Sequence, residues 1–391
     1  MFTKQNCSSF AYSGKLKDKA STRQTVGNTG LVKIFKDTRQ FAGNINTKEK
    51  YISSETKREA ISYEERWAIG LIDGDGHISM ECSSAKLQKW VPCLKVTLHA
   101  CNARAIYRLK KILGIGSITR SGDFISLGVR KLAGWKRLFI LFEKFPLRTD
   151  KYYAVEMVKK SLKLKQLAQE KNLFLAHFFG NVIISSTVKQ ISAKDRKVVH
   201  QCLLHWKHCL KSDRGKLSPV WFSLLPSAHP LLPSSSQISE AKDKEDKFLD
   251  KIDLLAAFDN SKRLLLEQVV DLYWLAGFIE AEGSFYILQN GQHGFAIGQA
   301  YNMLVIAGIH KRLNIKTSLK KRTLQENLSP YVQSETRDMA TLLKIATLLK
   351  GKMLGIKSFI LSVWLRTLRK NNRLKSQKAR DIIHKITQRT A

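Results

Sequence analysis

Two short acidic segments hold the side chains best placed to do chemistry. Asp73 and Asp75 lie in the segment IDGDG, and Glu280 and Glu282 lie in IEAEG, 207 residues further along the chain. Residues two apart on a helix point about 200° from each other, so only one acid of each pair can face a shared site. We predict that Asp75 and Glu282 face that site, and that the other two acids make structural hydrogen bonds.

The chemistry expected of Asp75 and Glu282 is metal binding. Two carboxylates brought together at helix C-termini repel each other, and the helix dipoles make the position more negative. A divalent cation relieves that repulsion, and Mg²⁺ in particular binds through one or two carboxylates plus substrate phosphates. Such a metal can activate water and stabilise the leaving oxygen of a phosphodiester. We therefore expect two or more divalent ions, Mg²⁺ being the natural choice.

The charge of the chain points to a polyanionic partner. Its 67 Lys and Arg outnumber its 32 Asp and Glu, which gives a formal net charge of +35. The 43% of apolar residues exclude wholesale disorder, and no apolar stretch is long enough to be a transmembrane helix. The sequence contains no P-loop, dinucleotide fingerprint or nucleophile elbow, so ATP and NAD are not implied.

The elements that position the acids occur twice. WAIGLIDGDGHI at 67–78 matches WLAGFIEAEGSF at 274–285, and NARAIYRLKKILGI at 102–115 matches NMLVIAGIHKRLNI at 302–315. Each block runs from an apolar helix through the acidic turn to alternating strands and an amphipathic helix. The sequence therefore predicts an α+β unit with an antiparallel sheet, repeated in tandem.

Small residues within the two motifs predict how the units meet. They recur four positions apart, which clears one face of each motif helix, and they are Gly70, Gly74, Gly277 and Ala281. Two such helices can approach backbone to backbone, so we expect them to pack against each other. We also expect Gly76 and Gly283 to end each helix in the left-handed conformation that helix C-termini often adopt.

The segments AIGLIDGDG at 68–76 and LAGFIEAEG at 275–283 resemble the two motifs of a LAGLIDADG homing endonuclease of the two-motif, single-chain kind. The resemblance covers roughly residues 62–180 and 264–370. It implies a pseudo-two-fold pair of units, with motif helices at the interface and saddle-shaped antiparallel sheets covered by helices on one face. It also implies a monomer that binds a long, asymmetric target in double-stranded DNA. Asp75 and Glu282 would each bind a divalent metal, and each centre would cut one strand.

The resemblance suggests four further site residues. Family members often carry a polar residue, frequently Gln, on the strand after the motif helix, where it holds water. The repeat alignment places Gln299 there in the second copy and His99 in the first, although both could be plain polar strand residues. The site lysine of the family corresponds to Lys151 and Lys357, where it could stabilise transition-state charge on the phosphate. A solvated basic face is the alternative interpretation of both lysines.

Composition shifts divide the chain into five expected segments. The stretch around 218–237 is rich in Pro and Ser and is typical of a linker. The segment HQCLLHWKHC at 200–209 offers zinc ligands, but its spacing fits no standard finger and a polar helix is favoured. The segments are a basic polar arm at 1–62, a first unit at 63–180, an insertion or linker at 181–263, a second unit at 264–370 and a basic tail at 371–391.

The function expected from these features is site-specific cleavage of double-stranded DNA by an intron-encoded endonuclease. The alternative is an RNA maturase that assists splicing of its host group I intron, since some similar proteins keep the fold and the motif in that role. A maturase would bind intron RNA through its basic surfaces and would not need Asp75 and Glu282. A non-catalytic DNA-binding protein would leave the paired acids unexplained. The resemblance further implies an organelle gene, in a chloroplast or a mitochondrion, and no membrane partner.

Overall fold

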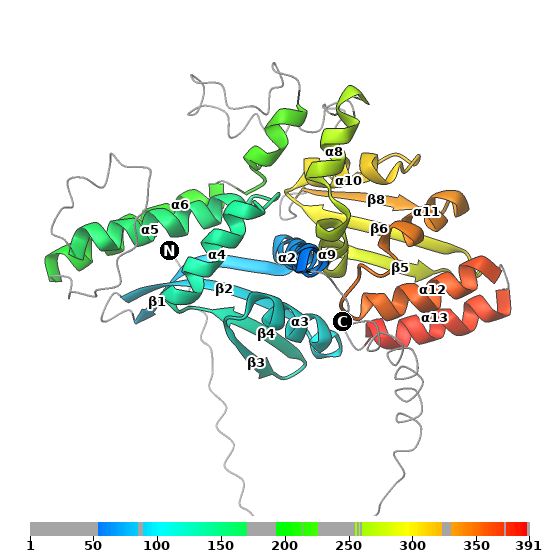
Figure 1. Cartoon of the computed structure of the whole chain (residues 1–391), viewed down its shortest axis with the longest axis horizontal. Coiled ribbons are helices and arrows are strands. Elements are labelled where there is room, and N and C mark those ends of the chain that lie inside the picture. Colours follow the sequence, from blue (N-terminus) through cyan, green and yellow to red (C-terminus); the bar gives the residue numbers. More distant parts are fainter. Residues whose placement is uncertain are drawn as a thin grey trace, which may run out of the picture. The chain divides into compact units, whose positions relative to one another are not determined.

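The computed structural model describes residues 54–84, 89–169, 193–212, 214–225, 255, 258, 260–322, 330–370 and 373–388. The chain divides into two compact units, Met1–Lys57 and Arg58–Ala391. The expected basic arm therefore lies outside the described residues up to residue 53. The second unit contains both acidic motifs and is the part described below (Figure 1). None of the described helices has the length and apolar character needed to cross a bilayer.

Two four-stranded antiparallel sheets share one strand order and confirm the predicted repeat. In the first sheet the order is β1 (Gly76–Ser84), β2 (Lys89–His99), β4 (Phe124–Val129) and β3 (Ser117–Ser121). In the second sheet it is β5 (Gly283–Ile287), β6 (His293–Ala300), β8 (Tyr331–Thr336) and β7 (Lys320–Arg322).

Alternating side chains give each sheet an apolar and a polar face. Leu94, Val96 and Leu98 of β2 are buried, whereas Lys95 between them is exposed, as expected for a half-buried strand. The β3–β4 hairpin turns at Gly122, whose φ of +55° is accessible to glycine at little cost.

Helices cover the apolar face of each sheet in the same order (Figure 1). In the first half, α3 packs on β2 and β4, and in the second half α10 packs on β6 and β8. The first set is α3 (Ala103–Leu113), α4 (Leu132–Lys144) and α5 (Lys151–Gln169), with the short 3₁₀ helix η2 (Ala100–Asn102) before α3. The second set is α10 (Met303–Leu313), α11 (Met339–Leu349) and α12 (Lys357–Lys370).

Each half ends in a further helix that was not expected to belong to the repeat. Helix α6 (Ala193–Ser212) packs against α5 and β1, and α13 (Arg373–Gln388) packs against α12 and β5. Trp90 Nε1 of β2 donates to His200 Nδ1 of α6 at 2.9 Å, and Ile383 of α13 is buried. The repeated architecture therefore includes one helix from the expected insertion and one from the expected tail.

Short elements lead into the second half. They are the 3₁₀ helices η4 (Pro219–Leu224) and η5 (Asn260–Lys262) and the helix α8 (Arg263–Val269). Trp221 of η4 is fully buried and its Nε1 donates to the carbonyl oxygen of Arg148 at 2.7 Å. Part of the proline-rich stretch is therefore packed against the body of the protein, while residues 226–237 lie outside the described residues.

The two motif helices, α2 (Ser54–Asp75) and α9 (Leu272–Glu282), pack against each other as predicted. A Cβ on Gly70 would overlap the carbonyl oxygen of Trp274, and a Cβ on Gly277 would overlap that of Trp67. The contact is therefore reciprocal, and any side chain at either glycine would force the helices apart.

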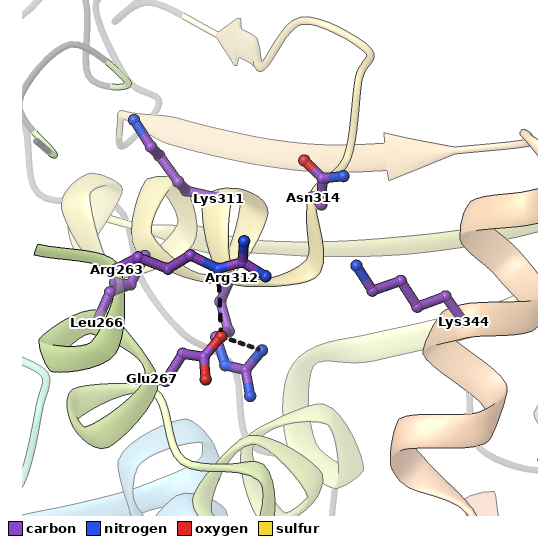
Figure 2. Close-up of a pocket in the computed structure, with 7 residues that line it drawn as sticks. All are labelled: Arg263, Leu266, Glu267, Lys311, Arg312, Asn314 and Lys344. Carbon is purple, nitrogen blue, oxygen red and sulfur yellow. Dashed lines mark ion pairs between the residues drawn. The ribbon is translucent and has the colours of Figure 1, made fainter. Parts of the chain in front are cut away.

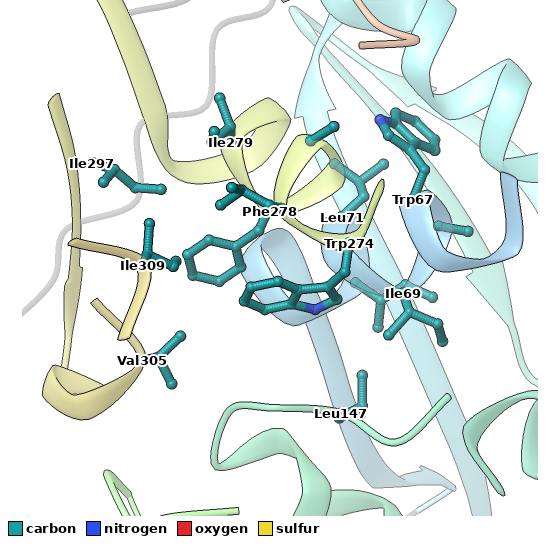
Figure 3. Close-up of a cluster of buried hydrophobic side chains, with 14 of the residues drawn as sticks. Trp67, Ile69, Leu71, Leu147, Trp274, Phe278, Ile279, Ile297, Val305 and Ile309 are labelled. Carbon is teal, nitrogen blue, oxygen red and sulfur yellow. The ribbon is translucent and has the colours of Figure 1, made fainter. Parts of the chain in front are cut away.

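The core extends outward from this helix contact (Figure 3). Trp67 and Leu71 of α2 and Trp274 and Phe278 of α9 are all fully buried. The rings of Trp274 and Phe278 stack with their centroids 4.9 Å apart. Burial of such large apolar side chains contributes about 1.5–3 kcal/mol each before the cost of ordering the chain, so the interface is also the main core.

The expectation of left-handed glycines at the ends of the motif helices is wrong. Neither Gly76 nor Gly283 has a positive φ, and Gly283 is extended, with φ −85° and ψ 154°. Each motif helix instead runs directly into the first strand of its sheet. A Cβ on Gly76 would overlap the carbonyl oxygen of Ile72, so glycine is required for this close approach rather than for a left-handed turn.

Candidate active site

The structure brings Asp75 and Glu282 to one place, at the last residues of α2 and α9. A Cβ on Gly74 would overlap that of Ala281 and would lie 3.4 Å from Cγ of Glu282, so the two helix ends are adjacent. Both carboxylates are half-buried. The arrangement therefore joins one acid from each repeat in a partly desolvated position.

Electrostatics at this position favour a cation. Burial raises the pKa of Asp75, against the opposing charges of Lys357 and Lys151. Burial also raises the pKa of Glu282, and the nearby charge of Asp75 raises it further, against Lys151 and Lys357. Raised carboxylate pKa values mean that the ionised forms lack solvation, which a bound cation would restore.

Lys151 and Lys357 lie beside the two acids and each caps the end of a motif helix. Lys151 Nζ donates to the carbonyl oxygens of Asp73, at 2.6 Å, and of Gly74. Lys357 Nζ donates to those of Ile279 and Ala281, both at 2.9 Å. Burial lowers the pKa of both ammonium groups, while nearby carboxylates oppose that effect. A solvated basic face does not describe these two residues.

The first acid of each motif is structural, as predicted. The buried carboxylate of Asp73 accepts hydrogen bonds from the Arg148 and Thr149 amides, at 2.9 and 3.2 Å, and from Thr149 Oγ1 at 2.7 Å. It also accepts from Trp274 Nε1 of the other motif helix at 2.8 Å. Glu280 accepts in the same way from the Gly355 amide, at 3.2 Å, and from the Lys357 amide at 3.1 Å. These bonds fix the segments that carry the two lysines.

Two buried asparagines cross between the halves, and sequence reasoning assigned them no role. Asn102 Oδ1 in the first half accepts from the Ile356 amide in the second at 2.9 Å. Asn302 Oδ1 in the second half accepts from the Asp150 amide in the first, also at 2.9 Å. Each asparagine thus holds the residue immediately before the lysine of the opposite half. The only sequence signal was that the repeat alignment paired the two asparagines.

Gln299 and His99 occupy different environments. Gln299 Nε2 donates to Glu282 Oε1 at 3.2 Å, and Gln299 Oε1 is buried without a hydrogen-bond partner among the described residues. His99 Nδ1 accepts from the Cys101 amide at 3.3 Å. The strand registers pair Gly76 with Val96 and Gly283 with Ile297, so the counterpart of Gln299 is Leu98. The sequence alignment of Gln299 with His99 is therefore displaced by one residue.

The donor set of the site suits a divalent ion. Asp75 and Glu282 supply two hard oxygen ligands, and the unpartnered amide oxygen of Gln299 is a further acceptor beside them. Within the part of the chain that the structure describes, no group of three His, Cys, Asp or Glu could hold a metal. The remaining ligands of an ion at Asp75 and Glu282 would therefore be backbone, water or phosphate oxygens.

The possible zinc ligands at 200–209 form part of α6. His200 is hydrogen bonded to Trp90, and His205 Nε2 lies 3.6 Å from Cys209 Sγ on an exposed helix face. No metal-binding group occurs there among the described residues. The polar helix that the spacing favoured is the arrangement found.

The face of each sheet turned away from its covering helices, its outer face, carries solvent-accessible side chains. On the second sheet Glu335 accepts hydrogen bonds from Lys320 and Tyr286, and Arg337 Nη2 donates to it at 2.9 Å. These bonds, that from Lys320 foremost, lower the pKa of Glu335 to about 2. On the first sheet Phe124 is exposed and its ring packs edge-on against His99, with centroids 5.9 Å apart. By strand register Gly128 of the first sheet corresponds to Glu335 of the second, so the first sheet has no carboxylate at that position.

Known proteins similar to this chain include intron-encoded endonucleases. The family model described as LAGLIDADG endonuclease matches residues 68–162. The probable intron-encoded endonuclease Cox1-I1b of Schizosaccharomyces pombe is 26% identical over 370 residues, which cover 91% of this chain and 77% of that protein. The probable intron-encoded endonuclease aI3 of Dictyostelium citrinum is 42% identical over 48 residues, or 12% of this chain and 20% of that protein.

Solved structures of two nucleases share the fold. The meganuclease I-SmaMI, bound to uncleavable DNA, aligns with a TM-score of 0.50 at 17% identity and covers 82% of this chain and 95% of its own. The homing endonuclease I-GzeII, in complex with its DNA target, aligns with a TM-score of 0.50 at 16% identity, covering 82% and 96%. The tandem α+β architecture with motif helices at its centre is thus an established one.

Proposed function

We propose that this chain is a LAGLIDADG endonuclease, and that it cuts both strands of a specific DNA site by phosphodiester hydrolysis. The observation that supports the proposal best is the meeting of Asp75 and Glu282 at the ends of two touching helices. One acid comes from each repeat, so the arrangement offers one centre for each strand. A binding protein without catalysis would not need two desolvated carboxylates there.

The residues around the acids have separate proposed roles. Divalent ions, Mg²⁺ in this proposal, would be held by Asp75 and Glu282 and would supply the charge that lowers the pKa of water and stabilises the leaving oxygen. Gln299 Oε1 is free to accept a hydrogen bond from a water molecule beside Glu282. Lys151 and Lys357 would place positive charge near the phosphate, where charge accumulates in the transition state. His99, the last residue of β2, accepts from the Cys101 amide and has no assigned part in the proposed chemistry.

The substrate of this activity would be double-stranded DNA lying along the outer faces of the two sheets. The net charge of +35 supplies attraction for the phosphate backbone. Because the outer side chains of the two sheets differ, the two half-sites of the target would differ in sequence. One chain supplies both halves of the site, so we propose a monomer. We also propose an intron within an organelle gene as its source.

Plasmid cleavage tests the proposal. Purified protein is incubated with Mg²⁺ and a plasmid that carries the intronless host-gene junction, beside the variants Asp75→Asn and Glu282→Gln. We expect wild-type protein to give linear DNA and both variants to lose the linear product. Glu143→Gln is the matched control, because that carboxylate is 66% exposed on α4 and contributes nothing to the site. It should cut as wild type does.

Two results would contradict the endonuclease. Wild-type protein that binds the junction DNA but leaves it uncut with Mg²⁺ or Mn²⁺ would exclude cleavage as the function of this chain. Loss of cutting in Glu143→Gln as well would show that cleavage depends on the total charge of the protein and not on Asp75 and Glu282 in particular. In the first case splicing of the host intron RNA becomes the activity to measure.

A further inference from the structure

A positively charged cleft opens between α8, α10 and α11 of the second half (Figure 2). Its volume is about 310 Å³. Figure 2 shows Arg263 and Arg312 paired with Glu267, whereas the Lys311 side chain is directed away from that carboxylate. The lining residues are Arg263, Leu266, Glu267, Lys311, Arg312, Asn314 and Lys344.

The cations of this cleft are not balanced from within it. One carboxylate, Glu267, serves two arginines, because its Oε1 lies 3.5 Å from both Arg263 Nε and Arg312 Nη1. Lys311 Nζ donates to the carbonyl oxygen of Phe258 at 2.6 Å, and no carboxylate among the described residues forms an ion pair with it. Arg312 Nε is buried and has no acceptor among the described residues. A buried donor of this kind costs free energy unless an acceptor reaches it.

The equivalent cleft in the first half shows that the fold does not require these charges. Between α2, α3 and α4 lies a cleft of about 190 Å³ that is lined mainly by leucine and isoleucine. Ile112 occupies the position of Arg312 in the repeat alignment. Lys144 there is neutralised by Glu65, with Nζ and Oε2 2.7 Å apart. The first cleft therefore has two cations, Arg137 and Lys144, against one carboxylate, whereas the second has four cations against one.

The charged cleft lies on the side of the second sheet away from its outer face. His310 of α10 is hydrogen bonded at 2.9 Å to Ser334, whose buried side chain points to the helix side of β8. Glu335, the next residue, points to the opposite side and belongs to the outer face. A ligand in the cleft would therefore be separated by the sheet from a duplex on the outer face.

We propose that this cleft binds phosphate groups of a second nucleic-acid strand, in addition to the target duplex. Arginine suits this ligand, because its guanidinium donates two parallel hydrogen bonds to phosphate oxygens. The free donor of Arg312 and the exposed ends of Arg263 and Lys344 provide such contacts from three helices. Neutralisation of backbone phosphates by Lys and Arg releases bound counterions, so the affinity also falls steeply as the salt concentration rises. The shared chemistry is the phosphodiester backbone, and the strand is either RNA or single-stranded DNA.

Binding of labelled single strands to the duplex-bound protein tests this proposal. The protein carries Asp75→Asn with Glu282→Gln so that the target stays intact, and saturating target duplex occupies the outer sheet faces. Fluorescence anisotropy of labelled oligouridylate and oligothymidylate is then followed over a salt series. Replacing two exposed cations, Arg263→Gln with Lys344→Gln, should raise the Kd several-fold. It should also reduce the slope of log Kd against log salt by about 1.4, the value for two lost contacts to a single strand.

The matched control is Arg137→Gln with Lys144→Gln, which removes the same charge from the first cleft. It should bind as the parent does, and both variants should melt as the parent does because the altered side chains lie at the surface. The labelled strand whose binding the cleft substitutions weaken, oligouridylate or oligothymidylate, identifies the ligand as RNA or DNA. Equal weakening by cleft and control variants would overturn the proposal, as would loss of all single-strand binding when duplex is added. Unchanged binding in Arg263→Gln with Lys344→Gln would overturn it as well.

Discussion

Asp73 and Asp75 are two residues apart and both carry a carboxylate, yet only the removal of Asp73 should destabilise the protein. Asp73 accepts four hydrogen bonds in the interior, one of them from the opposite motif helix. Asp75 is raised in pKa by burial and adds charge repulsion to Glu282. We expect Asp73→Ala to destabilise the protein strongly, and Asp75→Asn to leave its stability unchanged or higher while abolishing cleavage.

The magnitude for Asp73→Ala follows from the donors left behind. The hydroxyl of Thr149 can rotate to another acceptor, whereas the amides of Arg148 and Thr149 and the indole of Trp274 cannot. Each buried donor without a partner costs about 1–3 kcal/mol, and the effects within one network are not additive. A loss of about 3–5 kcal/mol is therefore expected, in the range measured when one partner of a buried charged pair is removed. For a chain of this size that lowers the Tm by about 4–6 °C.

Thermal unfolding followed by circular dichroism, with metal removed, measures both variants against wild type. Asp73→Asn is the conservative companion, because it retains one acceptor oxygen and should fall between wild type and Asp73→Ala. A Tm for Asp75→Asn as low as that of Asp73→Ala would refute the separation of roles. So would an Asp73→Ala protein that melts with wild type.

Three further outcomes are expected. Gly277→Ala should destabilise the protein by more than about 3 kcal/mol, the upper end for overpacking, because the new Cβ would overlap the Trp67 carbonyl oxygen. Gly128→Ala is the control and should not be destabilised in this way, because a Cβ there has no atom within 4 Å. Urea unfolding measures the free energy of unfolding of both variants. Gln299→Leu should slow cutting of one strand about 10- to 100-fold, so that nicked plasmid accumulates on a gel, and equal slowing of both strands would contradict this. Burial lowers the pKa of His310. The stability that the neutral side chain contributes is therefore complete above about pH 6.5 and is lost as the pH falls through the lowered pKa. His310→Gln should make the fall in Tm between about pH 7 and about pH 5 smaller than in wild type.

The repeated fold could be predicted because its signals are local. The small residues at Gly70 and Gly277 and the acidic turns recur in the same order in both blocks. The part that helices α6 and α13 play in the repeat was missed, because each buries only a few apolar side chains on a basic helix and the two share no motif. Their place in the repeat is visible only from what they pack against.

Within the site, the acids and lysines could be placed from the motifs, but the bonds that hold them could not. The contacts of Asn102 with Ile356 and of Asn302 with Asp150 join residues far apart in the chain. The displaced alignment of Gln299 has a local cause. In the first half η2 adds one residue between strand and helix, whereas the second half passes through Tyr301, with φ +66°. Because the sequences are similar before and after this one-residue difference, the alignment does not reveal it.

The reciprocal contact of Gly70 and Gly277 has the character of an isologous interface, in which the same patch serves on both sides. Two identical units could form it equally well, so duplication of a dimeric ancestor would preserve it without new contacts. Joining the copies in one chain makes their association intramolecular and independent of protein concentration. Once pairing no longer depends on identical partners, each half is free to change away from the interface, as the two clefts and the two outer sheet faces have done.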